Sequence, residues 1–313
     1  MVMEQMRVIA RAEELSPGAR KVCAAIGVFD GVHLGHQQVI RQTVADARQV
    51  EGVALVITFD RHPSSVVAPE RTPPLIYSLP QKLRAIESLG AEATLLIEFT
   101  REFSQIPAEE FIRQLAHQFG SIYSLCVGSA FTFGHKRGGN VELLRRLGQE
   151  LNFIVHGISS LALDGKIVSS TRIREAIKQG RLDAASQMIG RSYSVAGKVV
   201  RGDGIGRQLG FPTANIDCAA LLLPPNGVYA VHARTNGQSH RAVANIGLRP
   251  TLVSPAPRLQ VEAHLLDFSG DLYGEELEII FDAKLRDEQK FSSCEELTAQ
   301  IARDLAEARR IFS

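Results

Sequence analysis

The pattern of the chain changes near residue 190, and this change limits the fold more than any other feature of the sequence. Before that point, short apolar or β-branched runs alternate with segments of helical period, which is typical of a parallel sheet covered by helices. We therefore expect a doubly wound α/β domain. Its predicted strands are Val22–Val28, Val53–Phe59, Ala93–Glu98, Tyr123–Val127 and Phe153–Ile158. Its predicted helices are Leu34–Val50, Ser78–Leu89, Pro107–Phe119 and Asn140–Leu151, with Gly90 and Gly120 as stops.

Beyond Gly190, alternating strands separated by glycine turns favour a small antiparallel barrel. The last stretch, Ser293–Ile311, is predicted to be an amphipathic helix packed on that barrel. Two domains fit a chain of 313 residues, and we predict them at 1–188 and 189–313. The predicted strands are Tyr193–Arg201, Val228–Arg234, Arg241–Ile246, Leu259–Asp267 and Leu277–Leu285. The apolar face of the last helix consists of Leu297, Ile301, Leu305 and Ala308.

Charge and cysteine content narrow the class of protein. With 35 basic and 34 acidic residues, the net charge gives no reason to expect a nucleic-acid partner. The acidic start argues against a secretory signal, and the chain lacks long apolar runs, so we expect a cytoplasmic protein without a membrane partner. The cysteines show no disulfide or zinc pattern; Cys294 is expected to be exposed and the other three buried.

The first predicted strand leads into GVFDGVHLGHQ, residues 27–37. His33 and His36 are three residues apart at a predicted helix start, so both imidazoles should lie on one face of its first turn. Free backbone N–H groups and the positive end of the helix dipole suit a phosphate there, and Gly35 allows close approach. Two such histidines are often plain surface residues. At the carboxyl edge of an α/β sheet, however, they favour a site for nucleotidyl transfer.

Three further clusters belong to the first domain. His62 and Pro63 lie in TFDRHP after the second strand, and residues 128–140 form a glycine-rich basic loop. Phe131 and Phe133 in that loop could flank a flat ring, or the loop could be plain surface. SSTRIR, residues 169–174, is a helix start in which a serine is the cap and Arg172 is a candidate cation for a triphosphate.

In the second domain, the segment 197–215 has four glycines whose backbone amides could approach phosphate oxygens, or which could form only a mobile hairpin. The segment is not a Rossmann fingerprint, since no helix is expected to follow, and it lacks the GK[ST] of a Walker loop. Thr213 and Asn215 offer hard oxygen ligands suited to Mg²⁺, or are ordinary turn and strand-edge residues. Glu262, in an apolar strand, either faces the barrel interior as a proton acceptor or faces solvent. The four glycines are Gly202, Gly204, Gly206 and Gly210.

The strings GVFDGVHLGHQ, TFDRHP, VGSAFTFGHKRGGN and SSTRIR resemble the FAD synthetase module of bacterial bifunctional riboflavin kinase/FAD synthetases, an α/β nucleotidyltransferase of Rossmann-like HxGH type. The resemblance implies that His33 and His36 contact ATP phosphates, with Ser170, Thr171 and Arg172 on the opposite side of the triphosphate. It places FMN against His62, Pro63, Phe131 and Phe133. The loop residues assigned to ATP are Gly27, Phe29, Asp30, Gly31 and Gly35.

The strings GKVVRGDGIGRQLGFPTANI, PPNGVYAV, NIGLRPT, VEAHLLDFSGDLYGEELEIIF and LRDEQKFSSCEEL resemble a riboflavin kinase barrel. The resemblance implies that Thr213 and Asn215 bind Mg²⁺-ATP, that the glycine loop holds ATP, and that Glu262 is the catalytic base toward the ribityl 5′-hydroxyl. ATP is then the co-substrate, and riboflavin, FMN and FAD are substrates or products. We expect small-molecule substrates only, no nucleic acid, and a monomer or weak homo-oligomer.

Two positions depart from the family pattern. Arg61 replaces the usual proline, and Ala130 replaces an Asn or Asp, which removes one expected polar contact. FAD synthesis is therefore expected to be weaker than the family norm. The alternatives are a riboflavin kinase with weak or lost FAD synthesis and a non-catalytic flavin sensor. A tRNA synthetase-like enzyme would share the HxGH chemistry, but the near-neutral charge and the barrel argue against it.

Overall fold

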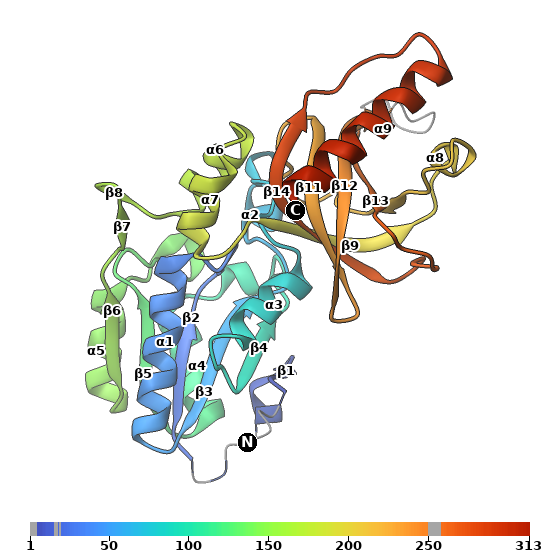
Figure 1. Cartoon of the computed structure of the whole chain (residues 1–313). Helices are drawn as coiled ribbons and strands as arrows, with labels where there is room; N and C mark the ends of the chain where they lie inside the picture. The colour runs from blue at the N-terminus through green and yellow to red at the C-terminus, as the bar shows by residue number, and fades with distance from the viewer. Residues whose placement is uncertain (1–4, 16–17, 19, 250–257) are drawn as a thin grey trace. The chain divides into compact units, whose positions relative to one another are not determined.

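The first compact unit contains a six-stranded sheet in which all strands are parallel (Figure 1). The structure, a computed structural model, describes residues 5–15, 18, 20–249 and 258–313. In this sheet, the central strand β2 pairs with β3 on one side and with β5 on the other. The chain therefore reverses its direction of winding beside β2, which is the place where open α/β sheets bind ligands. In spatial order the strands are β1 (Arg7–Ile9), β4 (Ala93–Ile97), β3 (Val53–Phe59), β2 (Val22–Ile26), β5 (Ile122–Gly128) and β6 (Ile154–Ile158).

Helices cover both faces of this sheet. Successive strand residues point to opposite sides, so both faces carry apolar side chains that must be buried. Even-numbered residues of β2, such as Ala24, pack with α4 (Ala108–Phe119) and α5 (Val141–Leu151). Odd-numbered residues such as Ala25 pack with α1 (Leu34–Gln49) and α3 (Leu79–Glu87). The doubly wound prediction is confirmed.

Local signals set the ends of several of these helices. Gly90 and Gly120 have φ angles of 91° and 71°, as expected of glycine stops. Asn140 caps α5 by accepting the Leu143 N–H at 2.9 Å. Asn152, in the left-handed region, ends the same helix. The predicted helix boundaries are confirmed to within two residues.

The second unit contains a closed six-stranded antiparallel barrel, as predicted, with helix α9 (Cys294–Ile311) against its wall (Figure 1). Ser293 caps α9, and Ala308 on its apolar face is fully buried. The strands point their other face into the barrel. Tyr229 and Phe281 lie on this inward face, with their ring centroids 5.3 Å apart. In spatial order the strands are β10 (Ala214–Ile216), β13 (Arg258–Leu265), β12 (Gln238–Arg249), β11 (Gly227–Thr235), β14 (Glu276–Arg286) and β9 (Ser194–Val200).

The helices α6 (Ser170–Lys178) and α7 (Leu182–Ile189) precede the barrel. By their contacts, residues 171–313 form the second unit together with a short segment, Pro74–Ser78, from earlier in the chain. That segment pairs with the loop before β11: the Leu75 N–H donates to Ala220 O at 3.0 Å. The chain therefore contributes to the second unit twice. The domain division at 188/189 stays a prediction.

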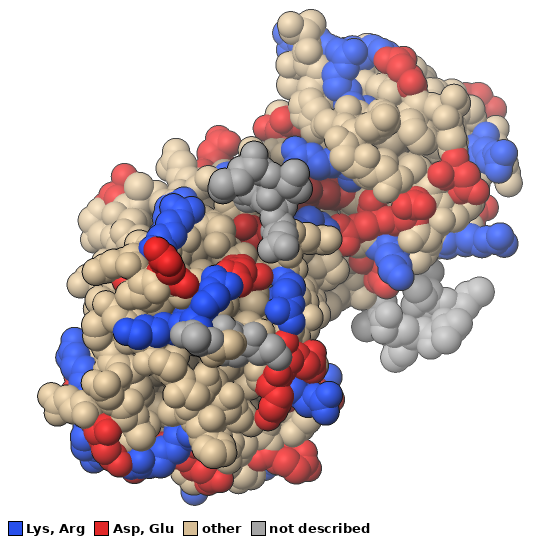
Figure 2. Space-filling model, turned by 90° about the horizontal axis from the view of Figure 1, so that it is seen from below, with Lys and Arg blue, Asp and Glu red and all other residues tan. Residues whose placement is uncertain are grey.

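The surface charge and the exposure of the cysteines agree with what the composition predicts. On the face shown in Figure 2, acidic and basic side chains are interspersed over the described residues. Cys23, Cys126 and Cys218 are buried and Cys294 is exposed, as predicted. In the part of the chain that the structure describes, we find no helix with both the length and the apolar character needed to span a membrane.

Candidate functional site

The loop after β2 has an uncommon backbone. Phe29, Gly31 and Val32 all have positive φ angles, of 52°, 76° and 38°. Non-glycine residues in this region cost about 1 kcal/mol or more each and concentrate at functional sites. The Phe29 ring is buried against Gly27, where a Cβ would come within 2.9 Å of it. Any nucleotide contact of Phe29 would therefore be made by its main chain.

His33 and His36 lie on one face of the first turn of α1, as their spacing predicts. His33 is the N-cap, and its Nδ1 accepts the His36 N–H at 3.4 Å. The two rings stack with their centroids 3.6 Å apart. At Gly35 a Cβ would stand 3.3 Å from the His33 ring, so the glycine makes room for this arrangement. Because Nδ1 of His33 accepts this hydrogen bond, Nε2 is the ring nitrogen that can act as a donor.

The His36 imidazole is held in its neutral form. Burial, followed by the charges of His33 and Lys82, keeps the pKa of His36 well below its ordinary value. Its Nδ1 is buried and has no hydrogen-bond partner among the described residues. Its ring and the Phe29 ring pack edge to face, with their centroids 5.3 Å apart. A buried polar atom without a partner requires an explanation, and a bound ligand would supply one.

The SSTRIR segment is connected to the histidine loop at its first helical residue. The Ser170 hydroxyl donates to the main-chain oxygen of Asp30 at 3.1 Å. This contact connects the start of α6 to the loop that carries His33. Thr171 and Arg172 belong to the second compact unit, and their assignment to the nucleotide stays a prediction.

Lys82, on α3, belongs to the same region and was not predicted. Its ammonium donates to the main-chain oxygen of Phe59 at 2.7 Å and to the Thr58 hydroxyl at 3.3 Å. The residue is only 8% exposed. Burial lowers the pKa of Lys82 to about 8, against the opposing effect of Asp30 and Asp60. In the sequence Lys82 is one lysine in an amphipathic helix, and nothing marks it as buried.

The glycine-rich loop after β5 carries the two aromatic side chains that could flank a flat ring, and their role toward a flavin stays a prediction. Phe131 and Phe133 stack on each other with their centroids 5.3 Å apart and 12° between their planes. Both rings pack against the core, and this explains their stacking, since burying them removes apolar surface from water. A flat ligand would therefore have to lie against the outside of this pair. The aromatic contacts continue through Phe111, Phe103, Phe99 and Phe59, which sequence reasoning missed.

His62 and Pro63 shape the loop after β3. His62 Nδ1 accepts the Ser64 N–H at 3.2 Å, and Pro63 is the N-cap of the short helix α2 (Ser64–Val67). This loop and the one that carries Phe131 both follow the carboxyl ends of strands in the same sheet. The role of His62 and Pro63 toward a flavin stays a prediction.

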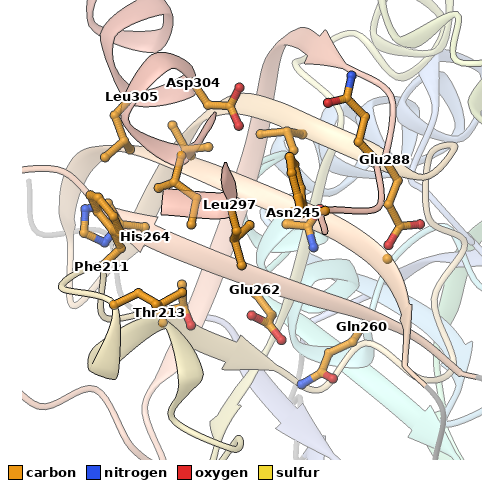
Figure 3. A pocket seen from close by; sticks show the side chains of 18 of the residues that line it. Phe211, Thr213, Asn245, Gln260, Glu262, His264, Glu288, Leu297, Asp304 and Leu305 are labelled. Atoms are coloured by element: carbon orange, nitrogen blue, oxygen red, sulfur yellow. The ribbon is translucent and has the colours of Figure 1, made fainter. Parts of the chain in front are cut away.

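The second unit contains a pocket of about 560 Å³ beside α9 (Figure 3). Figure 3 shows Thr213, Glu262 and Gln260 along one side, with Asp304 and Leu305 on the opposite side. The register places Glu262 directly opposite both Asn215 of β10 and Asn245 of β12. Polar groups from three adjacent strands therefore meet at one wall of the pocket.

One expectation for Glu262 was that it faces the barrel interior, and this is wrong. Its neighbours Val261 and Ala263 are fully buried on the interior face, so Glu262, Gln260 and His264 lie on the outer wall. Solvent exposure is not the outcome either, because Glu262 lines the pocket and is only partly exposed. The carboxylate therefore lies at a binding surface without being enclosed in the apolar core.

The glycine loop passes close to Thr213 and Asn215. A Cβ at Gly202 would come within 2.2 Å of the Asn215 amide, and one at Gly206 within 3.2 Å of the Thr213 hydroxyl. Gly204 has a φ of 72° and Gly210 one of 86°. Of the four glycines, Gly204 and Gly206 line the pocket.

As expected, no helix follows the glycine loop, which leads through Phe211 and Pro212 into strand β10, but the loop itself contains a helical turn. A single turn, α8 (Ile205–Gln208), begins directly after Gly204. It ends before Phe211 and Pro212, in keeping with the obstruction expected from that pair. One turn is too short to serve as a Rossmann helix, so this element does not restore that fingerprint.

The remaining wall of the pocket is apolar, and the ion pair between Arg286 and Asp304 lies at its end. Leu297, Ile301 and Leu305 of α9 line it. Arg286 donates to both oxygens of Asp304 at 2.7–3.0 Å. The sequence predicted these leucines and Ile301 only as a helix face that packs on the barrel. That they leave a pocket beside polar strand residues could not be predicted from their spacing.

Comparisons with known proteins agree with this division into two sites. Residues 16–172 match the family model described as FAD synthetase, and residues 189–312 match the one described as riboflavin kinase. The chain is 36% identical over 309 residues to the bifunctional riboflavin kinase/FMN adenylyltransferase of Escherichia coli strain K12, with 98% of each chain covered. The protein of the same description from Pseudomonas fluorescens is 36% identical over 306 residues, again with 98% of each chain covered.

A solved structure resembles the whole chain. It is described as a macrolide-efflux protein from Streptococcus pneumoniae and is similar to this chain with a TM-score of 0.79 and 28% identity. The match covers 97% of this chain and 98% of the other.

Proposed function

The chain belongs to the family of bifunctional riboflavin kinases/FMN adenylyltransferases, and from that premise we propose which residues carry each reaction. The protein phosphorylates riboflavin to FMN and adenylylates FMN to FAD, with ATP as co-substrate in both steps. The observation that carries the assignment is that each unit has its own polar site, His33 with His36 in one and Thr213, Asn215 and Glu262 in the other.

In adenylyl transfer, a phosphate oxygen of FMN forms a bond to the α-phosphorus of ATP as the bond to pyrophosphate breaks. His33 donates from Nε2, and the neutral His36 has one N–H to donate, beside the free N–H groups at the start of α1. These donors stabilise the negative charge that develops on the phosphate oxygens. Ser170 holds the loop in place through Asp30.

In the kinase reaction, Glu262 accepts the proton of the ribityl 5′-hydroxyl as that oxygen bonds to the γ-phosphorus and the bond to ADP breaks. The apolar wall formed by Leu297, Ile301 and Leu305 suits the flavin ring, while the polar wall suits the ribityl chain and phosphates. A pocket of about 560 Å³ is within the usual range for such ligands.

The residues of the polar wall fit Mg²⁺. The Thr213 hydroxyl and the Asn215 carbonyl are hard oxygen donors, and the Asn215 oxygen, which accepts from Gln260, keeps a second lone pair. Held by these oxygens, Mg²⁺ would neutralise charge on the transferred phosphate. No group of three or more His, Cys, Asp or Glu side chains suited to a metal occurs among the described residues, so a site shared with ATP phosphates is the arrangement that this donor set supports.

Purified protein given riboflavin, ATP and Mg²⁺ should form FMN and then FAD, resolved by chromatography. Thr213→Ala and Asn215→Ala should raise the Mg²⁺ concentration that FMN formation requires. FAD formation from supplied FMN serves as the control for folding of the remainder. FMN without FAD would support a kinase alone, and neither product would support a flavin sensor. A monomer or weak homo-oligomer located in the cytoplasm remains a prediction.

A further inference from the structure

Lys82 places a buried ammonium group at the edge of the sheet where the histidines lie. It reaches from α3 to the end of β3, where Phe59 O accepts from it. Its second acceptor, the Thr58 hydroxyl, itself donates to Val28 O at 3.1 Å. Val28 stands directly before the strained residue Phe29. One side chain thus connects α3, the end of β3 and the start of the histidine loop.

Charged and titratable groups from three other segments act on Lys82. Asp30 in the histidine loop and Asp60 after β3 attract its ammonium, and His36 at the start of α1 is affected by its positive charge. Asp60 is also bound by the Phe99 N–H at 2.9 Å and by Arg61 at 2.8 Å. A buried ammonium costs free energy, and a simpler core could have used an apolar side chain. A task at the site explains why the charge is present.

We propose that Lys82 is a positioning residue for adenylyl transfer, which fixes the histidine loop through Thr58 and Phe59 and keeps a positive charge beside His36. This inference rests on the proposed assignment of His33 and His36 to the ATP phosphates. The charge contributes to the potential that attracts polyphosphate and favours the neutral form of His36. The hydrogen bonds keep the ends of β2 and β3 in register while pyrophosphate departs.

Lys82→Met removes the charge and the hydrogen bonds but keeps the length of the side chain. We expect kcat for FAD formation from supplied FMN to fall about tenfold or more, because hydrogen bonds to charged groups are lost next to the reacting phosphates. FMN formation by the same protein should be unchanged, which provides an internal control for folding. Lys21→Met is the matched control, since Lys21 is exposed and precedes β2 at the opposite edge of the sheet.

The pH profile separates an electrostatic role from a merely structural one. FAD formation by the wild type should decline above about pH 8, where Lys82 loses its proton, and Lys82→Met should lack that decline. The inference is overturned if Lys82→Met keeps the wild-type kcat, if both activities fall together, or if the alkaline decline remains. His36→Ala tests the premise: loss of FAD formation in that variant with a silent Lys82→Met would reject only the role of Lys82.

Discussion

The rings of His33 and His36 stack with their centroids 3.6 Å apart and 19° between their planes. Two imidazolium ions at that distance would repel each other strongly, and the His33 side chain is buried while His36 is only partly exposed. The stacking therefore favours a pair in which His36 is neutral. The pair presents N–H donors to a phosphate with only a small desolvation penalty, in contrast to two charged rings.

His36→Ala should reduce FAD formation from FMN by about 10²-fold or more, because one positioned donor to the phosphate oxygens is lost. FMN formation from riboflavin should persist, since the kinase pocket belongs to the other unit. Chromatography of the two flavin products measures both steps in one reaction. His117→Ala, on α4, is a suitable control. An unchanged FAD yield would remove His36 from the reaction.

Glu262→Gln should show the opposite pattern. The amide keeps the shape of the side chain but cannot accept the hydroxyl proton, so FMN formation should slow by about 10²-fold. Adenylylation of supplied FMN should continue at the wild-type rate. Glu275→Gln, an exposed residue just before β14, serves as the matched control. Equal loss of both activities would contradict separate sites.

Gly202→Ala should damage the kinase through Asn215. The added methyl would overlap the Asn215 amide, which must move away from the polar wall. We expect the KM for Mg²⁺-ATP in FMN formation to rise about tenfold or more, with little effect on FAD formation. At Gly237 an added methyl meets no atom within 4 Å, so Gly237→Ala tests a glycine with positive φ away from the pocket. If both variants behave alike, the proposed contact is not responsible.

Periodicity was sufficient to predict most strands and helices of both units, because each signal is local, but it missed the helix α7 (Leu182–Ile189). Apolar spacing, Gly90 and Gly120 determine helix positions without knowledge of the rest of the chain. The three-residue strand β1 was missed because it is too short to show a period. The spacing of His33 and His36 likewise predicted their shared face, since one helical turn sets it.

What sequence reasoning missed depends on distant parts of the chain. Lys82 is buried only because the ends of β3 and the histidine loop meet above α3. The alternation around Glu262 shows that it opposes Val261 and Ala263, but which face is the interior depends on barrel closure. The stacking of Phe131 on Phe133 depends on the core beneath them.

Ala130→Asn should increase FAD formation. Ala130 is exposed in the loop after β5, so an amide can be added there without disturbing the core. The resemblance to the FAD synthetase module implies a polar side chain at this position, and one recovered hydrogen bond to a charged group contributes roughly 1.5–3 kcal/mol. The kcat/KM for FMN adenylylation should rise about tenfold, and FMN formation should not change. A rate equal to that of the wild type would show that the alanine does not limit the reaction.

The buried ammonium of Lys82 should also affect stability in a pH-dependent way. Its pKa falls from 10.5 in the unfolded chain to about 8 in the folded protein. Between these values the unfolded chain binds more protons, so the contribution of Lys82 to stability becomes more favourable as pH rises from about 8 to 10.5. A shift of this size corresponds to roughly 3 kcal/mol. Below pH 8 the full penalty of the buried charge is present.

Lys82→Met should lack this dependence. Its free energy of unfolding relative to wild type should be most favourable near pH 7 and should decline by roughly 3 kcal/mol toward pH 10.5. Urea unfolding of both proteins at several pH values gives this difference directly, and other alkaline titrations, such as that of Tyr229, cancel because both proteins contain them. Lys21→Met should follow the wild type throughout. A difference between Lys82→Met and wild type that does not vary with pH would mean that Lys82 is not a buried cation.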